Sequence, residues 1–137
     1  MNQYIIIIII LVLLLVIDVP VITIINNTMY KDQFIRINKE PINQNIRMYS
    51  AAIICYILLT LAIYYFVVVP ELNSSNFDII IKGMLLGLVI YGVYNTTNLA
   101  TVNQFGIKEA IVDTMWGSIV VGFIGFISIY LYKKYIL

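Results

Sequence analysis

Four long apolar segments alternate with polar stretches along the chain. The first runs from about residue 4 to 25, the second from 48 to 69, the third from 79 to 101 and the fourth from 109 to 132. At a rise of about 1.5 Å per residue, each segment can cross the roughly 30 Å of a hydrocarbon core as an α-helix. The pattern therefore predicts an all-α fold, an integral membrane four-helix bundle that forms a single domain over residues 1–137.

The first apolar segment has the position of a signal peptide but not its features. Residues Met1 to Gln3 carry no basic side chain. The unbroken apolar run from Tyr4 to Ile17 is longer than the usual signal-peptide core of about 7–15 residues, and no small-x-small cleavage site follows it. We therefore expect a retained membrane helix that kinks or ends near Pro20.

The composition supports a lipid environment. Hydrophobic residues make up 62% of the chain and charged residues 11%, whereas soluble domains have about 45–50% apolar and about 25% charged residues. A net charge of +1 without a basic stripe gives no reason to expect a nucleic-acid partner. Histidine is absent and Cys55 is the single cysteine, so we expect no metal site, no cofactor and no disulfide. The expected partner is the lipid bilayer.

The connections between the segments predict an orientation. Residues 26–47 form a polar loop that must share one side of the membrane with the third connection, residues 102–108. These two connections hold Lys31, Arg36, Lys39, Arg47 and Lys108, and the opposite face holds Lys82, Lys133 and Lys134. By the positive-inside rule, loop 26–47 is cytoplasmic and both termini lie on the other side. The sequence does not identify the membrane, although the small size and AT-rich bias suit a viral, host or organellar membrane.

Polar residues occur at membrane depth in three of the four segments. A charged group there costs at least about 2.5–3.5 kcal/mol. Nevertheless, Asp18 lies in the first segment, Asp113 in the fourth, and Asn95 and Asn98 in the third. Counted from the nearest connection, all four lie at similar depth in one leaflet. We therefore predict one intramembrane polar site, with Trp116 either lining it or serving as an interfacial belt residue.

Three interpretations of this polar level are open. The side chains can be interhelical hydrogen-bond donors and acceptors that hold the bundle together, a role worth about 0.6 kcal/mol on average. They can instead form a ligand, ion or proton site, or be solvated by water near the interface. Hydrogen bonding between helices explains the asparagines adequately. It explains the two carboxyl groups less well, because without a basic residue at their depth they would be protonated or share a proton or cation.

Small residues predict close helix packing. Gly83 and Gly87 form a small-xxx-small pair on the face of the third segment that also carries the asparagines. In the fourth segment Gly117 lies on the face of the aspartate, whereas Gly122 and Gly125 lie on roughly the opposite face. The fourth helix is therefore expected to contact neighbours on both sides, or a second copy in a homo-oligomer.

Two motifs resemble those of a known family. The stretch from Tyr91 to Thr101 reads YGVYNTTNLAT, and the stretch from Asp113 to Gly117 reads DTMWG. They are similar to Y-G-x-Y-D-x-T-N-L-A-T and D-x-x-W-G in an uncharacterised family of bacterial predicted membrane proteins with a domain of unknown function. The resemblance covers nearly the whole chain and implies four membrane helices but no activity. Asn95 replaces the aspartate of the family motif and Val21 its usual aromatic residue, so any proton or cation chemistry of that acid would be absent here.

No feature of the sequence favours an enzyme. Histidine, a nucleophile-elbow serine and a phosphate-binding loop are all missing. We expect a multi-pass membrane protein of unknown activity that acts as a structural or assembly component of a membrane. The alternative is a small ion- or proton-coupled carrier that uses Asp18 and Asp113 and dimerises to enclose a pathway. A membrane-embedded enzyme acting on a lipid is the third hypothesis.

Overall fold

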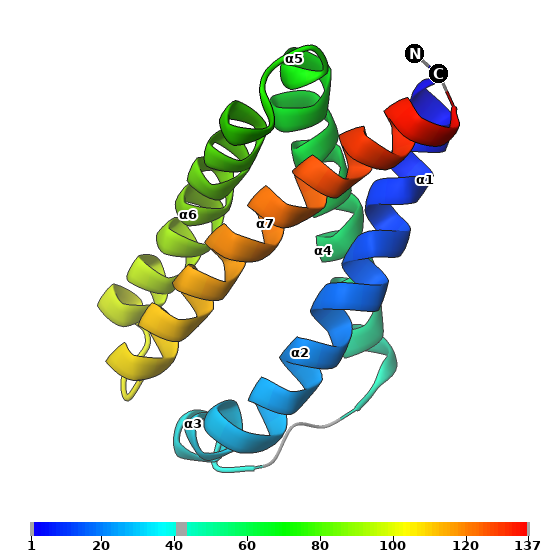
Figure 1. Cartoon of the computed structure of the whole chain (residues 1–137). Helices are drawn as coiled ribbons and strands as arrows, with labels where there is room; N and C mark the ends of the chain where they lie inside the picture. The colour runs from blue at the N-terminus through cyan, green and yellow to red at the C-terminus, as the bar shows by residue number, and fades with distance from the viewer. Residues whose placement is uncertain (1, 41–43, 137) are drawn as a thin grey trace.

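The fold consists of long helical runs (Figure 1). The structure is a computed structural model that describes residues 2–40 and 44–136. Four helical runs are long and apolar enough to cross a membrane: Gln3–Asn38, Ile46–Glu71, Asn76–Thr101 and Ile107–Tyr135. Within the described ranges the chain forms no strand. The predicted all-α class with four membrane helices is therefore confirmed.

The first helical run is longer than predicted. It consists of α1 (Gln3–Leu13), the π-helical turn η1 (Leu14–Asp18), α2 (Val19–Ile25), the π-helical turn η2 (Asn26–Tyr30) and α3 (Lys31–Asn38). The prediction of a loop over residues 26–47 is thus wrong for residues 26–38. No Pro or Gly interrupts this stretch, and its polar residues are tolerated in a helix once it leaves the lipid. The helix ends where Lys39 adopts the left-handed conformation, with a φ of 61°.

The first two helical runs continue past their internal prolines. Pro20 follows η1, and Pro70 follows the π-helical turn η3 (Tyr64–Val68), in both cases two residues after the turn ends. A proline lacks one N–H group, and its ring clashes with the carbonyl four residues earlier. A wide turn before the proline moves that carbonyl away. We expected the first helix to kink or to end near Pro20. The second alternative is wrong, because the helix continues through Pro20 to the end of α2 and beyond.

The other helices complete the bundle. The second run comprises α4 (Ile46–Ile63), η3 and the short α5 (Val69–Glu71). A short connection leads to α6 (Asn76–Thr101), which forms an antiparallel hairpin with α7 (Ile107–Tyr135). Helix α1 packs against α7 and α4, and Figure 1 shows both chain ends at the same end of the bundle.

A row of buried side chains determines where Asp18 points. Ile6, Ile10, Leu14 and Asp18 follow one another at intervals of four and are each at most 2% exposed. The three apolar members pack in the core with residues of η3 and α7. An ordinary helix turns by about 100° per residue, so side chains spaced four residues apart shift by about 40° around the helix at each step and gradually leave one face. The wider turn η1 reduces this drift, and Asp18 stays inside the bundle.

Glycines allow the backbones of α6 and α7 to approach closely. A Cβ atom on Gly83 would lie 2.7 Å from the Cα atom of Gly122, and a Cβ atom on Gly87 would lie 2.8 Å from the Cα atom of Ser118. The hydroxyl group of Ser118 also donates a hydrogen bond of 2.8 Å to a backbone carbonyl of α6. The hairpin therefore depends on the absence of side chains at these glycines.

Two further glycines of α7 accommodate side chains of neighbouring helices. The ring of Tyr91 on α6 lies against Gly117, and Val67 of η3 lies against Gly125. Helix α7 thus contacts helices of its own chain on two faces, which is one of the two alternatives expected for it. A homo-oligomer stays a prediction.

The end of the first helical run holds the connection between α6 and α7. The side-chain oxygen of the buried Gln33 accepts a hydrogen bond of 2.8 Å from the N–H group of Gly106. Arg36 forms an ion pair with Glu109 at 3.4 Å, and the hydroxyl group of Tyr30 donates to the backbone carbonyl of Glu109 at 3.1 Å. Side chains of η2 and α3 therefore contact the α6–α7 connection and the start of α7.

Candidate intramembrane polar site

Asp18 connects three helical runs. Its side chain is 2% exposed. One carboxylate oxygen accepts a hydrogen bond of 2.7 Å from the indole N–H group of Trp116 on α7, and the other accepts one of 2.9 Å from the hydroxyl group of Tyr56 on α4. Both donors are uncharged at neutral pH. The carboxyl group thus links the first, second and fourth runs, and among the described residues it has no basic partner.

Asp113 forms a second polar centre, three residues before Trp116 on the same helix. One of its oxygens accepts a hydrogen bond of 2.8 Å from the side-chain nitrogen of Asn95 on α6. The hydroxyl group of Tyr30 in η2 lies beside the same carboxyl group. Asp113 therefore joins the two helices of the hairpin and faces the end of the first run.

The amide group of Asn95 has a defined orientation. Its nitrogen lies 2.9 Å from the backbone carbonyl of Tyr91, and its other hydrogen-bond partners are Asp113 and, at 3.2 Å, the hydroxyl group of Thr114. Because the carbonyl of Tyr91 can only accept, the amide nitrogen has to face it. The amide oxygen of Asn95 is buried and has no hydrogen-bond partner among the described residues. An unpaired buried acceptor costs about 1–3 kcal/mol, so this oxygen reduces the stability of the contact between α6 and α7.

The predicted site residues fall into two centres. Asp18 and Trp116 belong to one, and Asp113 and Asn95 belong to the other. Asn98 is half-buried, and in the part of the chain that the structure describes it bonds to neither aspartate. Asn98 follows Asn95 by three residues, so it is rotated by about 60° away from the side of α6 that faces Asp113.

Three residues of these centres were not among the predicted site residues. Tyr56 lies in the second apolar segment, and Thr114 directly follows Asp113 in the DTMWG motif. Tyr30 lies in a stretch that was predicted to be a loop. The signal for Tyr56 and Thr114 is a hydroxyl group on a membrane helix, whereas Tyr30 could be found only after its helix had been recognised.

Two open grooves lie next to the polar centres but do not include the aspartates. One, of about 530 Å³, runs between α6 and α7 and is lined by apolar residues together with Asn95, Thr96 and Thr114. The other, of about 580 Å³, lies between α4 and Ile90 of α6 and includes Cys55. Over residues 2–40 and 44–136, no group of three or more His, Cys, Asp or Glu side chains is placed to hold a metal ion. The aspartates thus face protein donors, not these grooves.

Comparison with protein-family models identifies a family for this chain. The family model described as "Predicted membrane protein (DUF2177)" matches residues 3–130. The matched range contains both aspartates, their donors and nearly all of the four membrane helices. No curated protein and no solved structure matches the chain.

Proposed function

The chain belongs to the DUF2177 family of predicted membrane proteins, and we propose that it is a structural or assembly component of a membrane. In this proposal Asp18 and Asp113 are helix-fastening groups. The observation that carries the proposal is that donors from other helices bind both carboxyl groups directly: Trp116 and Tyr56 for Asp18, and Asn95 for Asp113. A small protein of this kind contributes a rigid, lipid-embedded bundle to a larger membrane assembly.

The number of bonds at Asp18 supports a fastening role. Each carboxylate oxygen of Asp18 has its own donor, from a different helix. Hydrogen bonds to charged groups contribute about 1.5–3 kcal/mol each, and those between membrane helices average about 0.6 kcal/mol. Even at the lower value, the bonds at the two centres would together stabilise one arrangement of the helices.

A small ion- or proton-coupled carrier is the second candidate function. One observation favours it: the ion pairs of the described residues join Arg36 to Glu109 and Lys82 to Glu71, and neither buried aspartate has a basic partner. A carboxyl group inside a membrane without such a partner can bind a proton or a cation. Intramembrane carboxyl groups also form proton relays in pumps and transporters.

The Asp113→Asn variant distinguishes these two functions. It keeps the size of the side chain but replaces one of the two acceptor oxygens by an NH2 group, so a single oxygen is left to accept from Asn95 and from the neighbouring Tyr30. We expect the free energy of unfolding in lipid nanodiscs to fall by about 1–3 kcal/mol. Proteoliposomes with wild-type protein or with the variant should show the same proton and cation flux as empty vesicles.

The matched control is Asn98→Leu. It alters a polar residue that was predicted at a similar membrane depth but that bonds to neither aspartate. This control should be as stable as wild type. A proton or cation flux through the wild-type protein that Asp113→Asn abolishes would contradict the structural proposal and support the carrier.

A further inference from the structure

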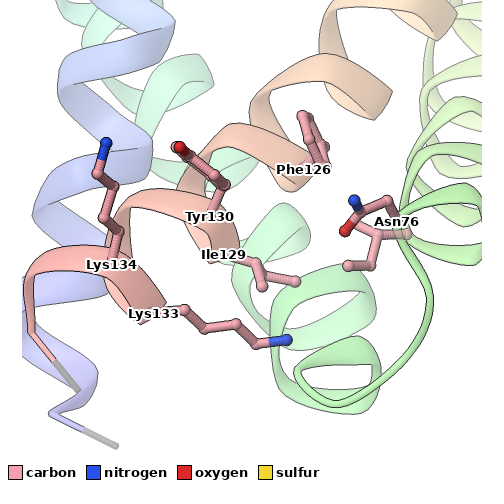
Figure 2. Close-up of a pocket in the computed structure, with 7 residues that line it drawn as sticks. Asn76, Phe126, Ile129, Tyr130, Lys133 and Lys134 are labelled. Atoms are coloured by element: carbon pink, nitrogen blue, oxygen red, sulfur yellow. The ribbon is translucent and has the colours of Figure 1, made fainter.

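A pocket of about 210 Å³ lies at the end of the α6–α7 hairpin that is remote from the two aspartates (Figure 2). It combines an apolar floor with a polar and basic rim. The floor consists of Ile79, Phe126 and Ile129, and the rim of Asn76, Tyr130, Lys133 and Lys134. Figure 2 shows Lys133 extending toward the α6 side of the pocket and Lys134 on the side away from Asn76.

The rim carries positive charge that no described residue neutralises. Among the described residues, Lys133 and Lys134 form no ion pair with a carboxylate. The ammonium group of Lys134 lies 5.6 Å from the ring centre of Tyr130 and 5.1 Å from that of Tyr135. Such cation–π contacts position the ammonium group but leave its charge in place.

The carboxylates near this end of the bundle are already bonded. Glu71 is buried and forms an ion pair with Lys82. Asp78 accepts a hydrogen bond of 2.7 Å from the hydroxyl group of Ser75, the N-cap residue of α6. Neither carboxylate lines the pocket. The two lysines of the rim are therefore available to an anionic ligand.

The pocket lies where lipid headgroups are expected. Helix α6 begins and helix α7 ends there, so both membrane spans end at this level. The side chains of Phe77, Tyr130 and Tyr135 are exposed, and aromatic residues of this kind gather at membrane interfaces. An apolar floor on the membrane side and a basic rim on the water side match an amphiphile with an anionic head.

We propose that this pocket binds the phosphate group of an anionic phospholipid. Lys133 contacts the phosphate from the α6 side of the pocket, and Lys134 adds positive charge on the opposite side of the rim. Asn76 and Tyr130 donate hydrogen bonds to the phosphate or to the headgroup, and the apolar floor contacts the first carbons of an acyl chain. Lysines in the last turn of a helix also interact favourably with its dipole. That interaction alone gives no preference among lipids, so lipid selectivity is the property that identifies the site.

Native mass spectrometry of the full-length protein with phosphatidylglycerol and phosphatidylcholine tests the proposal. A basic residue near an anionic membrane surface strengthens binding by about fivefold. Wild-type protein should therefore prefer phosphatidylglycerol, and the Lys133→Gln/Lys134→Gln double variant should lose about 25-fold in affinity for it. The control is Lys31→Gln, which removes an exposed lysine at the other end of the bundle and should keep the wild-type preference.

The Asn76→Leu variant distinguishes a built pocket from surface charge, because it keeps both lysines and removes one polar group of the rim. We expect weaker binding of phosphatidylglycerol with some preference retained. Equal binding of the two lipids by wild-type protein, or unchanged binding by either pocket variant, would overturn the proposal. Displacement of the lipid by inorganic phosphate would overturn its lipid part and assign the site to free phosphate. Since none of these results involves flux or the aspartates, they leave the proposed function unaffected.

Discussion

Gly87→Ala is expected to lower the free energy of unfolding by about 1–3 kcal/mol, although alanine is the better helix former. A Cβ atom at this position would lie 2.8 Å from the Cα atom of Ser118 and also against the backbone carbonyl of Gly117. Backbone atoms cannot rotate away as the end of a flexible side chain can. The two helices of the hairpin would have to separate, and much of the contact between α6 and α7 would weaken.

Gly92→Ala is the matched control for this substitution. Gly92 lies in the same helix, but the one atom near its added Cβ is a methyl carbon of Thr114 at 3.7 Å, an ordinary packing distance. This variant should therefore differ from wild type by less than about 1 kcal/mol. Unfolding in mixed micelles, monitored by the fluorescence of Trp116, measures both variants. Equal losses at the two glycines would show that close backbone approach does not stabilise this hairpin.

Trp116→Phe is expected to have the largest effect among changes at the polar centres. It removes the indole donor at 2.7 Å from Asp18 and leaves one carboxylate oxygen without a partner inside the bundle. Hydrogen bonds to charged groups are worth about 1.5–3 kcal/mol, so we expect a loss of that size. Tyr56→Phe removes the other donor and should destabilise the protein in the same way.

A double-mutant cycle isolates this interaction from general packing effects. In the Asp18→Leu background the carboxylate is absent, so Trp116→Phe should lower the free energy of unfolding clearly less than it does in the wild-type protein. Tyr65→Phe is a control for the loss of a hydroxyl group, because Tyr65 is exposed on the same helical run as Tyr56. Additive effects of Asp18→Leu and Trp116→Phe would mean that the two side chains do not interact in the membrane.

The membrane helices could be predicted from the sequence because apolar length alone identifies them. The third segment was predicted at residues 79–101 and extends over Asn76–Thr101. The helical stretch Asn26–Asn38 could not be predicted in this way, since it is polar and its stability depends on contacts such as the one between Gln33 and Gly106. The π-helical turn before Pro20 likewise leaves no mark in a hydropathy pattern.

The candidate site was predictable in its residues but not in its pairing. Placing an aspartate in a membrane segment costs free energy whichever group it bonds to, so Asp18 and Asp113 could be identified from their positions alone. Which donor each one finds depends on how helices rotate and pack. Trp116 lies 98 positions from its partner Asp18, and no periodicity within one helix contains that information.

Asn95 illustrates how a single residue type changes the chemistry of such a centre. In the motif that this chain resembles, an aspartate occupies the position. A second carboxyl group there would lie within hydrogen-bond distance of Asp113, and two such groups share one proton because both cannot ionise at that separation. Asparagine supplies an uncharged N–H donor, so Asp113 has a hydrogen-bond partner that does not titrate. This substitution fits a fastening role for the site.

The indole N–H resonance of Trp116 tests most directly the central claim that buried aspartates fasten the helices. The chain has a single tryptophan, so a ¹⁵N-labelled sample in nanodiscs gives one indole signal that needs no assignment. We predict that this signal exchanges slowly with solvent, shifts strongly in Asp18→Leu, and is unchanged in Asp78→Asn, which alters an exposed aspartate at the start of α6. An indole signal that exchanges rapidly and keeps its position in Asp18→Leu would contradict the account.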